Sequence, residues 1–220
     1  MHVYFIFYMY MKIYIFTPDE LPTKHWTSTA HLAELAERGC TVVHGVNVHD
    51  MHEHVALKRM TRFDRVIFNF PHAGHDPFYC ERHAELIRRH KELLRAFFRS
   101  AKFMLSEGGE VHVSHRDDYP YCEWKLQEIA EKEGFQLHEK VEFKKVDYPG
   151  YHNKRGGGIR SNKTFPLKEC FTFKFMLKEC REKRVLQICS ENGREDYELQ
   201  ITQRSGGEED VTMVVPELAI

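Results

Sequence analysis

The chain has 220 residues, a length that suits one α/β domain with additional segments better than two full domains. Its 32 basic and 33 acidic side chains give a formal net charge of -1, which excludes a uniformly basic nucleic-acid coat protein. Hydrophobic residues make up 42% of the chain, enough for a buried core, so a wholly disordered protein is excluded as well. Any binding driven by charge must therefore be local.

The N-terminal residues 1–16 are almost continuously apolar, but Lys12 interrupts the run. The stretch is shorter than the roughly 20 residues that a bilayer-spanning helix needs. It also lacks the basic start and the small-residue cleavage site of a secretory signal. We therefore expect no membrane partner. Residues 12–16 are β-branched and aromatic and predict a buried strand, while residues 1–11 stay ambiguous.

Strands and helices alternate along the next part of the chain. Capping residues, amphipathic spacing and terminal glycines predict helices at residues 27–38, 50–60, 81–105 and 121–133. Apolar, β-branched runs predict strands at residues 40–46, 63–70, 110–115, 135–146 and 169–177. This alternation predicts an α/β fold with a mostly parallel sheet. The last two strands have no helix between them and should pair as an antiparallel hairpin.

The composition changes after Lys178. Residues 179–220 hold ten acidic and five basic side chains and few apolar clusters. The pattern predicts an acidic tail that is peripheral to the domain or partly disordered.

Cysteine and histidine spacings do not predict a metal centre. The six cysteines form no C-x-x-C pair, which indicates a reducing compartment rather than a zinc ribbon or a disulfide scaffold. Three of the fifteen histidines lie in VHDMHEH at residues 48–54, where a solvated helix start is the simpler interpretation. No P-loop and no G-x-S-x-G motif is present, which disfavours nucleotide hydrolysis and serine hydrolase chemistry.

The most informative short motif follows the strand predicted at residues 63–70. Ligands of open α/β sheets bind beyond the carboxyl ends of the strands, and Asn69, Phe70, Pro71 and His72 lie there. Amide and carbonyl acceptors with a packed ring can hold a planar nitrogen-bearing group, and a histidine such as His72 can accept a proton. An ordinary turn after a buried strand explains the same residues equally well.

A second pattern is electrostatic. Residues 144–178 hold nine basic and two acidic side chains, a net charge of +7 in a chain whose total is -1. Aromatic residues and three consecutive glycines lie among the bases, a composition suited to phosphate contacts and base stacking. We interpret this segment as an RNA-contacting loop, with a merely solvated hairpin loop as the alternative. The residues expected to contact RNA are Tyr151, Lys154, Arg155, Arg160 and Lys163.

Three sequence blocks carry a family resemblance: FDRVIFNFPHAGH, GEVHVSHRDDYPYCEWKLQEIAEKEGF, and YPGYHNKRGGG followed by CFTFKF. In this order they resemble the Bmt5-like domain of the ribosomal RNA (uridine-N3) methyltransferases, especially its plant members, over residues 12–178. The resemblance implies a Rossmann-like methyltransferase fold, S-adenosylmethionine as cofactor, and methylation of a uridine in large-subunit rRNA. It also implies a location in the nucleus or nucleolus, or in the cytoplasm, and we expect a monomer.

Position in the family's motifs implies roles for individual residues. Asp19 is expected to hold the cofactor ribose, and Asn47, where the family usually has aspartate, to contact the adenine. Asn69, Pro71 and His72 are expected beside the transferred methyl group, with His72 as the base. The family's opening G-E-G-[DN]-F-S-F block is absent, so we expect an N-terminally incomplete domain. Two functions stay open: an rRNA methyltransferase, and a catalytically inactive RNA-binding relic of the same fold.

Overall fold

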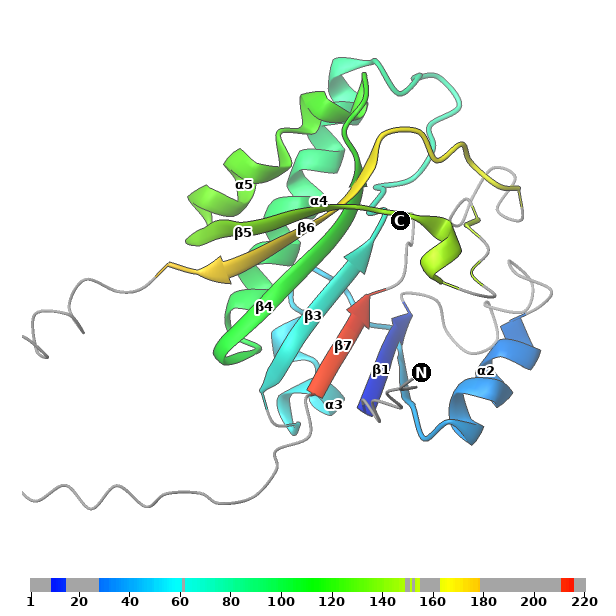
Figure 1. Ribbon diagram of the computed structural model, residues 1–220, viewed down its shortest axis with the longest axis vertical. Coiled ribbons are helices and arrows are strands. Elements are labelled where there is room, and N and C mark those ends of the chain that lie inside the picture. Colours follow the sequence, from blue (N-terminus) through cyan, green and yellow to red (C-terminus); the bar gives the residue numbers. More distant parts are fainter. Residues whose placement is uncertain are drawn as a thin grey trace, which may run out of the picture.

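A computed structural model describes residues 9–14, 28–60, 62–148, 151, 153–154, 163–178 and 211–215. Their strands form one seven-stranded sheet in the order β2-β1-β7-β3-β4-β6-β5 (Figure 1). The strands are β1 (Met9–Tyr14), β2 (Thr41–His44), β3 (Phe63–Asn69), β4 (Leu105–Arg116), β5 (Phe135–Glu142), β6 (Cys170–Leu177) and β7 (Val211–Val215).

Strand directions divide the sheet into two parts. The neighbours among β2, β1, β7, β3 and β4 are parallel, whereas β6 pairs antiparallel with both β4 and β5. The antiparallel pairing of the strands now seen as β5 and β6 was predicted and is confirmed, with Phe135 opposite Leu177. The mostly parallel α/β sheet is confirmed too.

The longest described helix is α4 (Ala84–Lys102). His83 precedes it and caps its first turn, because Nδ1 of His83 accepts the backbone N–H of Glu85 at 3.2 Å. Among the described helices, none combines the length and apolarity that a bilayer crossing requires. The other helical segments are α2 (Ser28–Glu37), η1 (Met51–Glu53), α3 (Val55–Lys58), η2 (Tyr121–Trp124), α5 (Leu126–Lys132) and η3 (Lys145–Asp147).

Two of the predicted helices are interrupted. The segment predicted at residues 50–60 divides at His54 into η1 and α3. The segment predicted at 121–133 divides at Lys125 into η2 and α5, because Lys125 has a φ of 56°, in the left-handed region. A left-handed residue cannot continue a right-handed helix, and amphipathic spacing alone does not reveal such a break.

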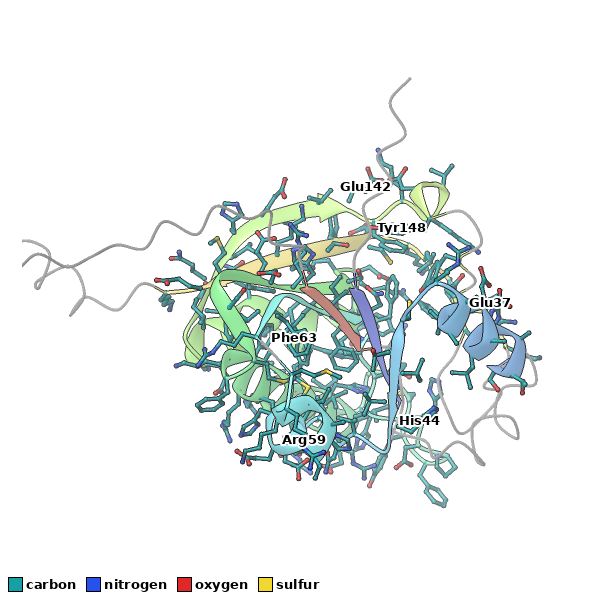
Figure 2. The ribbon with its side chains drawn as sticks, turned by 90° about the horizontal axis from the view of Figure 1, so that it is seen from below. Glu37, His44, Arg59, Phe63, Glu142 and Tyr148 are labelled. Atoms are coloured by element: carbon teal, nitrogen blue, oxygen red, sulfur yellow. The ribbon has the colours of Figure 1, made fainter. Side chains whose placement is uncertain are left out.

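The main core lies between the sheet and the helices α4 and α5. Side chains of β3, β4 and β6, such as Phe68, Val113 and Phe175, are buried there against Phe97 and Phe98 of α4. Burial of each large apolar side chain contributes about 1.5–3 kcal/mol, so this layer fixes the positions of β3 and β4. Figure 2 shows the ends of α3 and β5, marked by Arg59 and Glu142, on opposite sides of the molecule.

Residues 211–215 differ from the predicted peripheral tail, because they form β7 in the middle of the sheet. The backbone of β7 pairs with β1 on one side and with β3 on the other. Its sequence, Val-Thr-Met-Val-Val, is a short β-branched run typical of a buried parallel strand. The charged composition of residues 179–210 concealed this run, and those residues lie outside the described part of the chain.

The position of β7 is also the point where the sheet reverses its strand order. The chain moves outward from β1 to β2, then returns across the sheet to β3 and continues to β4 on the other side. In doubly wound sheets, ligands bind in the crevice beyond the carboxyl ends of the strands at this reversal. The fold therefore directs attention to the carboxyl ends of β1, β7, β3 and β4.

Candidate active site

A cavity of about 360 Å³ lies beyond the carboxyl ends of β3 and β4. Its volume falls in the range of small-ligand sites, about 300–1,000 Å³. Aromatic rings and histidines together make up most of the wall, which also holds one carboxylate and one guanidinium. The lining residues are Phe70, Pro71, His72, His75, Tyr79, Cys80, Glu81, His115, Arg116, Tyr121, Trp124, Phe165 and Pro166.

The end of β3 is fixed to β4 before the chain enters the cavity wall. Asn69 Oδ1 accepts a hydrogen bond from the hydroxyl of Ser114 at 2.9 Å. Phe70 has a φ of 47°, a left-handed conformation that is strained for an aromatic residue and costs about 1–3 kcal/mol. Its ring packs edge-on against Phe143 and Phe165. This strained turn brings Pro71 and His72 into the cavity wall.

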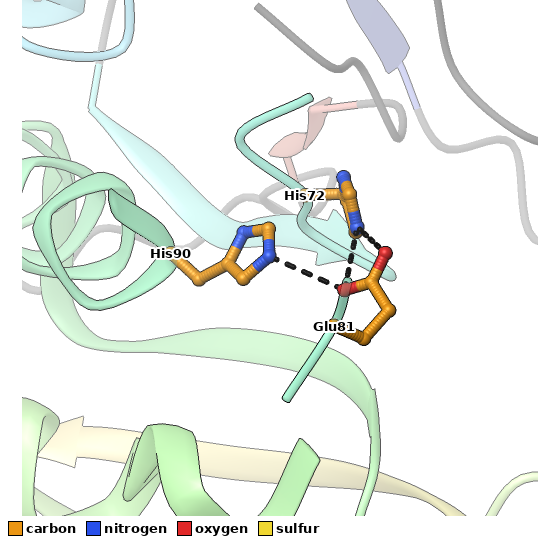
Figure 3. Close-up of side chains that lie close together, drawn as sticks. All are labelled: His72, Glu81 and His90. Atoms are coloured by element: carbon orange, nitrogen blue, oxygen red, sulfur yellow. Dashed lines mark hydrogen bonds and ion pairs between the residues drawn. The ribbon is translucent and has the colours of Figure 1, made fainter. Parts of the chain in front are cut away.

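Three histidines surround the carboxylate of Glu81, in the loop between β3 and α4. His72 Nε2 lies 3.1 Å from Oε1 and 3.3 Å from Oε2 of Glu81. His75 Nδ1 lies 3.3 Å from Oε1, and His90 Nε2, on α4, lies 3.5 Å from Oε2. Figure 3 shows the rings of His72 and His90 directed at the carboxylate from two sides. We call these four residues the Glu81 cluster.

Backbone contacts determine which ring nitrogens carry protons in the Glu81 cluster. The N–H of Gly74 donates to His72 Nδ1 at 3.1 Å, and the N–H of Ala73 donates to His90 Nδ1 at 3.0 Å. A nitrogen that accepts a hydrogen bond is unprotonated, so each ring holds its proton on Nε2. The Nε2–H of His72 therefore points at Glu81 at hydrogen-bond distance, whereas the Nε2 of His90 faces Oε2 of Glu81 at 3.5 Å, the outer limit of such a contact.

Burial and hydrogen bonds shift the pKa values at this site in a consistent way. Burial raises the pKa of the Glu81 carboxyl, but hydrogen bonds from His72, His75 and His90 outweigh it and hold that pKa well below its ordinary value. Burial lowers the pKa of His90 to about 4, although Glu81 acts in the opposite direction. Burial also lowers the pKa of His115 to about 4. At neutral pH the site thus holds an ionised Glu81 beside neutral His90 and His115 rings.

The distances in the Glu81 cluster invite comparison with a metal centre. Ligand atoms of His72, Glu81 and His90 all lie within 4.8 Å of one another. A metal-bound histidine, however, donates its second ring N–H to a carbonyl or carboxylate. The second nitrogens of His72 and His90 instead accept backbone N–H groups, which leaves protons on the atoms that would face the metal. The donor chemistry fits a hydrogen-bonded carboxylate better than a metal site.

The opposite wall is formed by the end of β4 and by η2. The ring of Trp124 stacks on His90 with centroids 3.9 Å apart. The guanidinium of Arg116 lies 4.1 Å from the ring centroid of Tyr121 and is paired with Asp118. Flat rings and a fixed cation therefore face the cavity, a surface suited to stacking on a planar ligand.

The predicted loop between β5 and β6 contributes to the same cavity. Asn153 is buried, and its Nδ2 donates to the backbone oxygen of Phe165 at 2.5 Å. Phe165 lines the cavity, so the loop holds one of its walls in place. Tyr151 packs edge-on against Phe143, beside Tyr148, which Figure 2 marks near the end of β5.

The predicted site residues fall into four groups. Pro71 and His72 line the cavity, and Asn69 lies directly behind them on β3. Asn47 lies exposed after β2, where its Oδ1 accepts the backbone N–H of His49, and it does not line the cavity. Lys154 and Lys163 are exposed on the basic loop. The predicted residues Asp19, Arg155 and Arg160 lie outside the described part of the chain.

Sequence patterns missed the carboxylate at the centre of the site. Glu81 follows the N-F-P-H motif by nine residues, within a segment that was predicted as the start of a helix. The pair His72 and His75 in the H-A-G-H sequence was a usable signal, because both rings lie in one short loop. His90 gave no signal, since a histidine on a helix face is ordinarily a structural residue.

Comparison with known proteins identifies the family. The family model described as BMT5-like, rRNA (uridine-N3-)-methyltransferase BTM5-like, matches residues 13–155. The chain belongs to this family. The resemblance inferred from the sequence blocks is thereby confirmed, and the α/β sheet is the fold of a BMT5-like domain.

Relatives in two kingdoms share this domain. The Arabidopsis thaliana protein At4g26485 is 42% identical over 158 residues, which cover 71% of this chain and 75% of that protein. Heavy metal-associated isoprenylated plant protein 41 of Arabidopsis thaliana is 46% identical over 71% of this chain and 30% of its own length. The 25S rRNA (uridine(2634)-N(3))-methyltransferase of Saccharomyces cerevisiae is 28% identical over 47% of this chain and 39% of its own length. The chain thus spans under half the length of the last two relatives.

Solved structures resemble the chain only distantly. The glycopeptide N-methyltransferase MtfA complexed with sinefungin aligns with a TM-score of 0.43 at 11% identity, covering 77% of this chain and 86% of that one. This likeness is too low to carry an argument, so among the comparisons only the family and its relatives bear on function.

Proposed function

We propose that this BMT5-like chain transfers a methyl group from S-adenosylmethionine to N3 of a uridine in large-subunit rRNA. One observation carries the proposal: Phe70, Pro71 and His72 of the N-F-P-H block lie in the wall of a cavity at the carboxyl ends of β3 and β4. The description of the family and the name of the yeast relative supply the reaction and the nucleotide. By the same analogy we expect a nuclear or nucleolar location, with the cytoplasm as the alternative, and we keep the expectation of a monomer.

The cavity suits a nucleobase taken out of its stack. Aromatic rings and histidines make up most of its lining, so a uracil in the cavity would be enclosed by rings, and stacking contributes about 1–3 kcal/mol per base. Enzymes that modify a base place it in a closely fitting pocket of this kind and leave the strand outside. A base in this cavity would lie next to the Glu81 cluster, where a proton can be accepted.

The chain's residues at the strand ends offer donors for the cofactor. Nδ2 of Asn69, at the end of β3 beside β7, meets no acceptor among the described residues, so this amide is available to a ligand. The exposed carboxamide of Asn47 lies at the end of β2, where the family resemblance puts the adenine contact. This donor set fits S-adenosylmethionine, and Asp19 stays the proposed ribose ligand. When bound, the cofactor would supply an electrophilic methyl group.

The RNA strand would leave the cavity across a second hollow of about 500 Å³ that adjoins it. Glu81, Arg116 and Tyr121 line both hollows, and Arg82 and Lys168 line the second one. Neither Arg82 nor Lys168 makes an ion pair with any described residue, so both cations are available to phosphates. With these two we keep the predicted RNA contacts Tyr151, Lys154, Arg155, Arg160 and Lys163.

A second function is favoured by one feature, the identity of the central strand. In dinucleotide-binding sheets a glycine-rich turn follows the central strand and lets the backbone approach the cofactor. Here β7 is central, and residues 216–220, which follow it, contain no glycine. This feature supports an RNA-binding protein that uses the same cavity and basic loop without methyl transfer.

Calorimetric titration with S-adenosylmethionine separates the two functions. The methyltransferase requires binding with a micromolar dissociation constant, and the RNA-binding alternative requires none. The same protein should then be titrated with a uridine-containing rRNA fragment, because RNA binding is common to both functions. Cofactor binding that is lost in the variants Asn69→Ala and Asn47→Ala would place the cofactor at the strand ends.

A further inference from the structure

His75 differs from the other histidines of the cavity in one respect. Its Nδ1 lies 3.3 Å from Glu81 Oε1, a contact that favours the ring form with the proton on Nδ1 because an ionised carboxylate only accepts hydrogen bonds. In the neutral ring, Nε2 then carries a lone pair. No described residue makes a hydrogen bond or ion pair with this Nε2, and His75 lines the cavity with its side chain 23% exposed.

The remaining rings at the site have no comparable nitrogen. His72 uses Nδ1 to accept the N–H of Gly74 and Nε2 to donate to Glu81. His90 is fully buried and uses Nδ1 to accept the N–H of Ala73. His115 is buried too, and its lowered pKa of about 4 makes it a weak base at neutral pH.

From this geometry we propose that His75 Nε2 is the proton acceptor of the site and that Glu81 is the residue that positions it. The arrangement has the same logic as a carboxylate–histidine pair in hydrolases, in which a carboxylate binds Nδ1–H and leaves Nε2 as the base. His72 acts one step further away, because its Nε2–H holds the Glu81 carboxylate in place, and His90 packs beside that carboxylate with Nε2 3.5 Å from Oε2. The proposal replaces His72 by His75 as the base.

The identity of the proton rests on the proposed function. Uridine N3 is a weak acid, and its proton would pass to His75 Nε2 while the electron pair of the N–H bond stays on N3. That pair forms the new bond to the methyl carbon, and the donor sulfur keeps the electrons of the carbon–sulfur bond that breaks. The imidazolium that results is stabilised by the negative charge of Glu81. Glu81 itself accepts no proton, since its pKa is held well below its ordinary value.

Kinetic variants test the role of His75. His75→Asn keeps an N–H donor for Glu81 near the position of Nδ1 but removes Nε2, so kcat should fall by about 10²-fold. The KM for RNA should change by less than about threefold, because the base is not needed for binding. His138→Asn is the matched control: the His138 ring is exposed on β5 outside the cavity lining, and activity should stay at the level of the unchanged protein. Added imidazole should restore part of the activity of His75→Ala.

A second measurement decides the proposal without any activity. Ring ¹⁵N chemical shifts of the full chain should show His75 protonated on Nδ1, and His72 and His90 protonated on Nε2. In Glu81→Gln the His75 ring should lose its preference for the Nδ1–H form, whereas Glu85→Gln, whose carboxylate binds Arg88 and Arg89, should leave it unchanged. Addition of Zn²⁺ should not displace these signals.

Three results would overturn the proposal. They are full activity of a folded His75→Asn variant, an unprotonated Nδ1 on His75, and ring signals that shift on stoichiometric Zn²⁺, which would make the Glu81 cluster a metal site. If the unchanged protein transfers no methyl group at all, the proposed function fails, and the ring shifts alone then decide whether Glu81 positions His75.

Discussion

The backbone N–H of Phe70 donates to the carbonyl of Ser114 at 2.7 Å, so the first residue after β3 is bonded to the neighbouring strand β4. This bond holds Phe70 in its left-handed conformation, with a φ of 47°. The strain at this position directs the chain from the sheet into the wall of the cavity. Substitutions at Phe70 can therefore separate backbone strain from side-chain packing.

Replacement of Phe70 by glycine should destabilise the protein less than replacement by alanine. Both variants lose the buried ring, but only glycine is unstrained at a positive φ, which should favour it by about 1 kcal/mol. Urea unfolding measures the difference. The control pair is Phe68→Gly and Phe68→Ala, in the extended part of β3. Here the alanine variant should be more stable than the glycine variant. Alanine more stable than glycine at position 70 would show that the turn is not strained.

Acidification should destabilise the protein below pH 6.5. The folded pKa of His90 and of His115 is about 4, against about 6.5 for an exposed ring, so the unfolded state binds more protons between these values. The free energy of unfolding is therefore highest above pH 6.5 and falls as the pH drops towards 4. At pH 5 each of the two rings should lower the free energy of unfolding by about 2 kcal/mol relative to its value above pH 6.5.

Urea unfolding at pH 7.5 and pH 5 measures this dependence. His115→Gln should weaken it, because one buried ring no longer titrates. His138→Gln is the control, since the His138 ring is exposed on β5 and should not change the dependence. A free energy of unfolding that is equal at both pH values would contradict the burial of the two neutral rings.

The central position of β7 predicts that the sheet depends on it. Val214 pairs with Lys12 on β1 and with Ile67 on β3. Val214→Pro removes a backbone donor between two strands and should lower the free energy of unfolding by roughly 1–3 kcal/mol. Val214→Ile keeps the donor and the β-branched shape and should have little effect. Equal stability of Val214→Pro and the unchanged protein would mean that β7 does not hold the sheet together in solution.

Arg82 and Lys168 should contribute to RNA binding through phosphates alone. The double variant Arg82→Ala, Lys168→Ala should reduce the slope of log Kobs against log salt by about 1.4, or roughly 0.7 for each single-strand contact. Fluorescence anisotropy with a labelled rRNA fragment measures this slope. The control variant is Arg38→Ala, Lys58→Ala, which removes two cations that are already paired with carboxylates. It should leave the slope unchanged. A slope that stays the same in the first variant would exclude the second hollow as the path of the strand.

Sequence periodicity was sufficient for most of the sheet and insufficient for two decisive parts of the molecule. The alternation of apolar runs and amphipathic segments predicted β2 to β6 and the antiparallel pairing, because β3, β4 and β6 bury one face each, although β5 buries little beyond Phe135. It did not predict the central position of β7, since pairing between residues 211–215 and residues 63–69 is a long-range choice. The break at Lys125 was missed because left-handed geometry leaves no mark in hydrophobic spacing.

The site was predicted in part for a similar reason. Asn69, Pro71 and His72 stand in one motif at a strand end, where the fold brings ligands. Glu81 and His90 reach the same place from a loop and from a helix turn, through contacts that no local pattern encodes. The direction of each ring depends on backbone donors such as the N–H of Ala73, and these positions are set only in the folded loop.

Transfer of a labelled methyl group tests the central proposal most directly. The protein should be incubated with S-adenosylmethionine that carries a deuterated methyl group and with unmodified large-subunit rRNA, and the digested nucleosides analysed by mass spectrometry. We predict labelled 3-methyluridine, reduced about 10²-fold in rate in His75→Asn and unaffected in His138→Asn. Absence of labelled 3-methyluridine, with RNA binding intact and no heat of S-adenosylmethionine binding, would contradict the methyltransferase and leave the RNA-binding function.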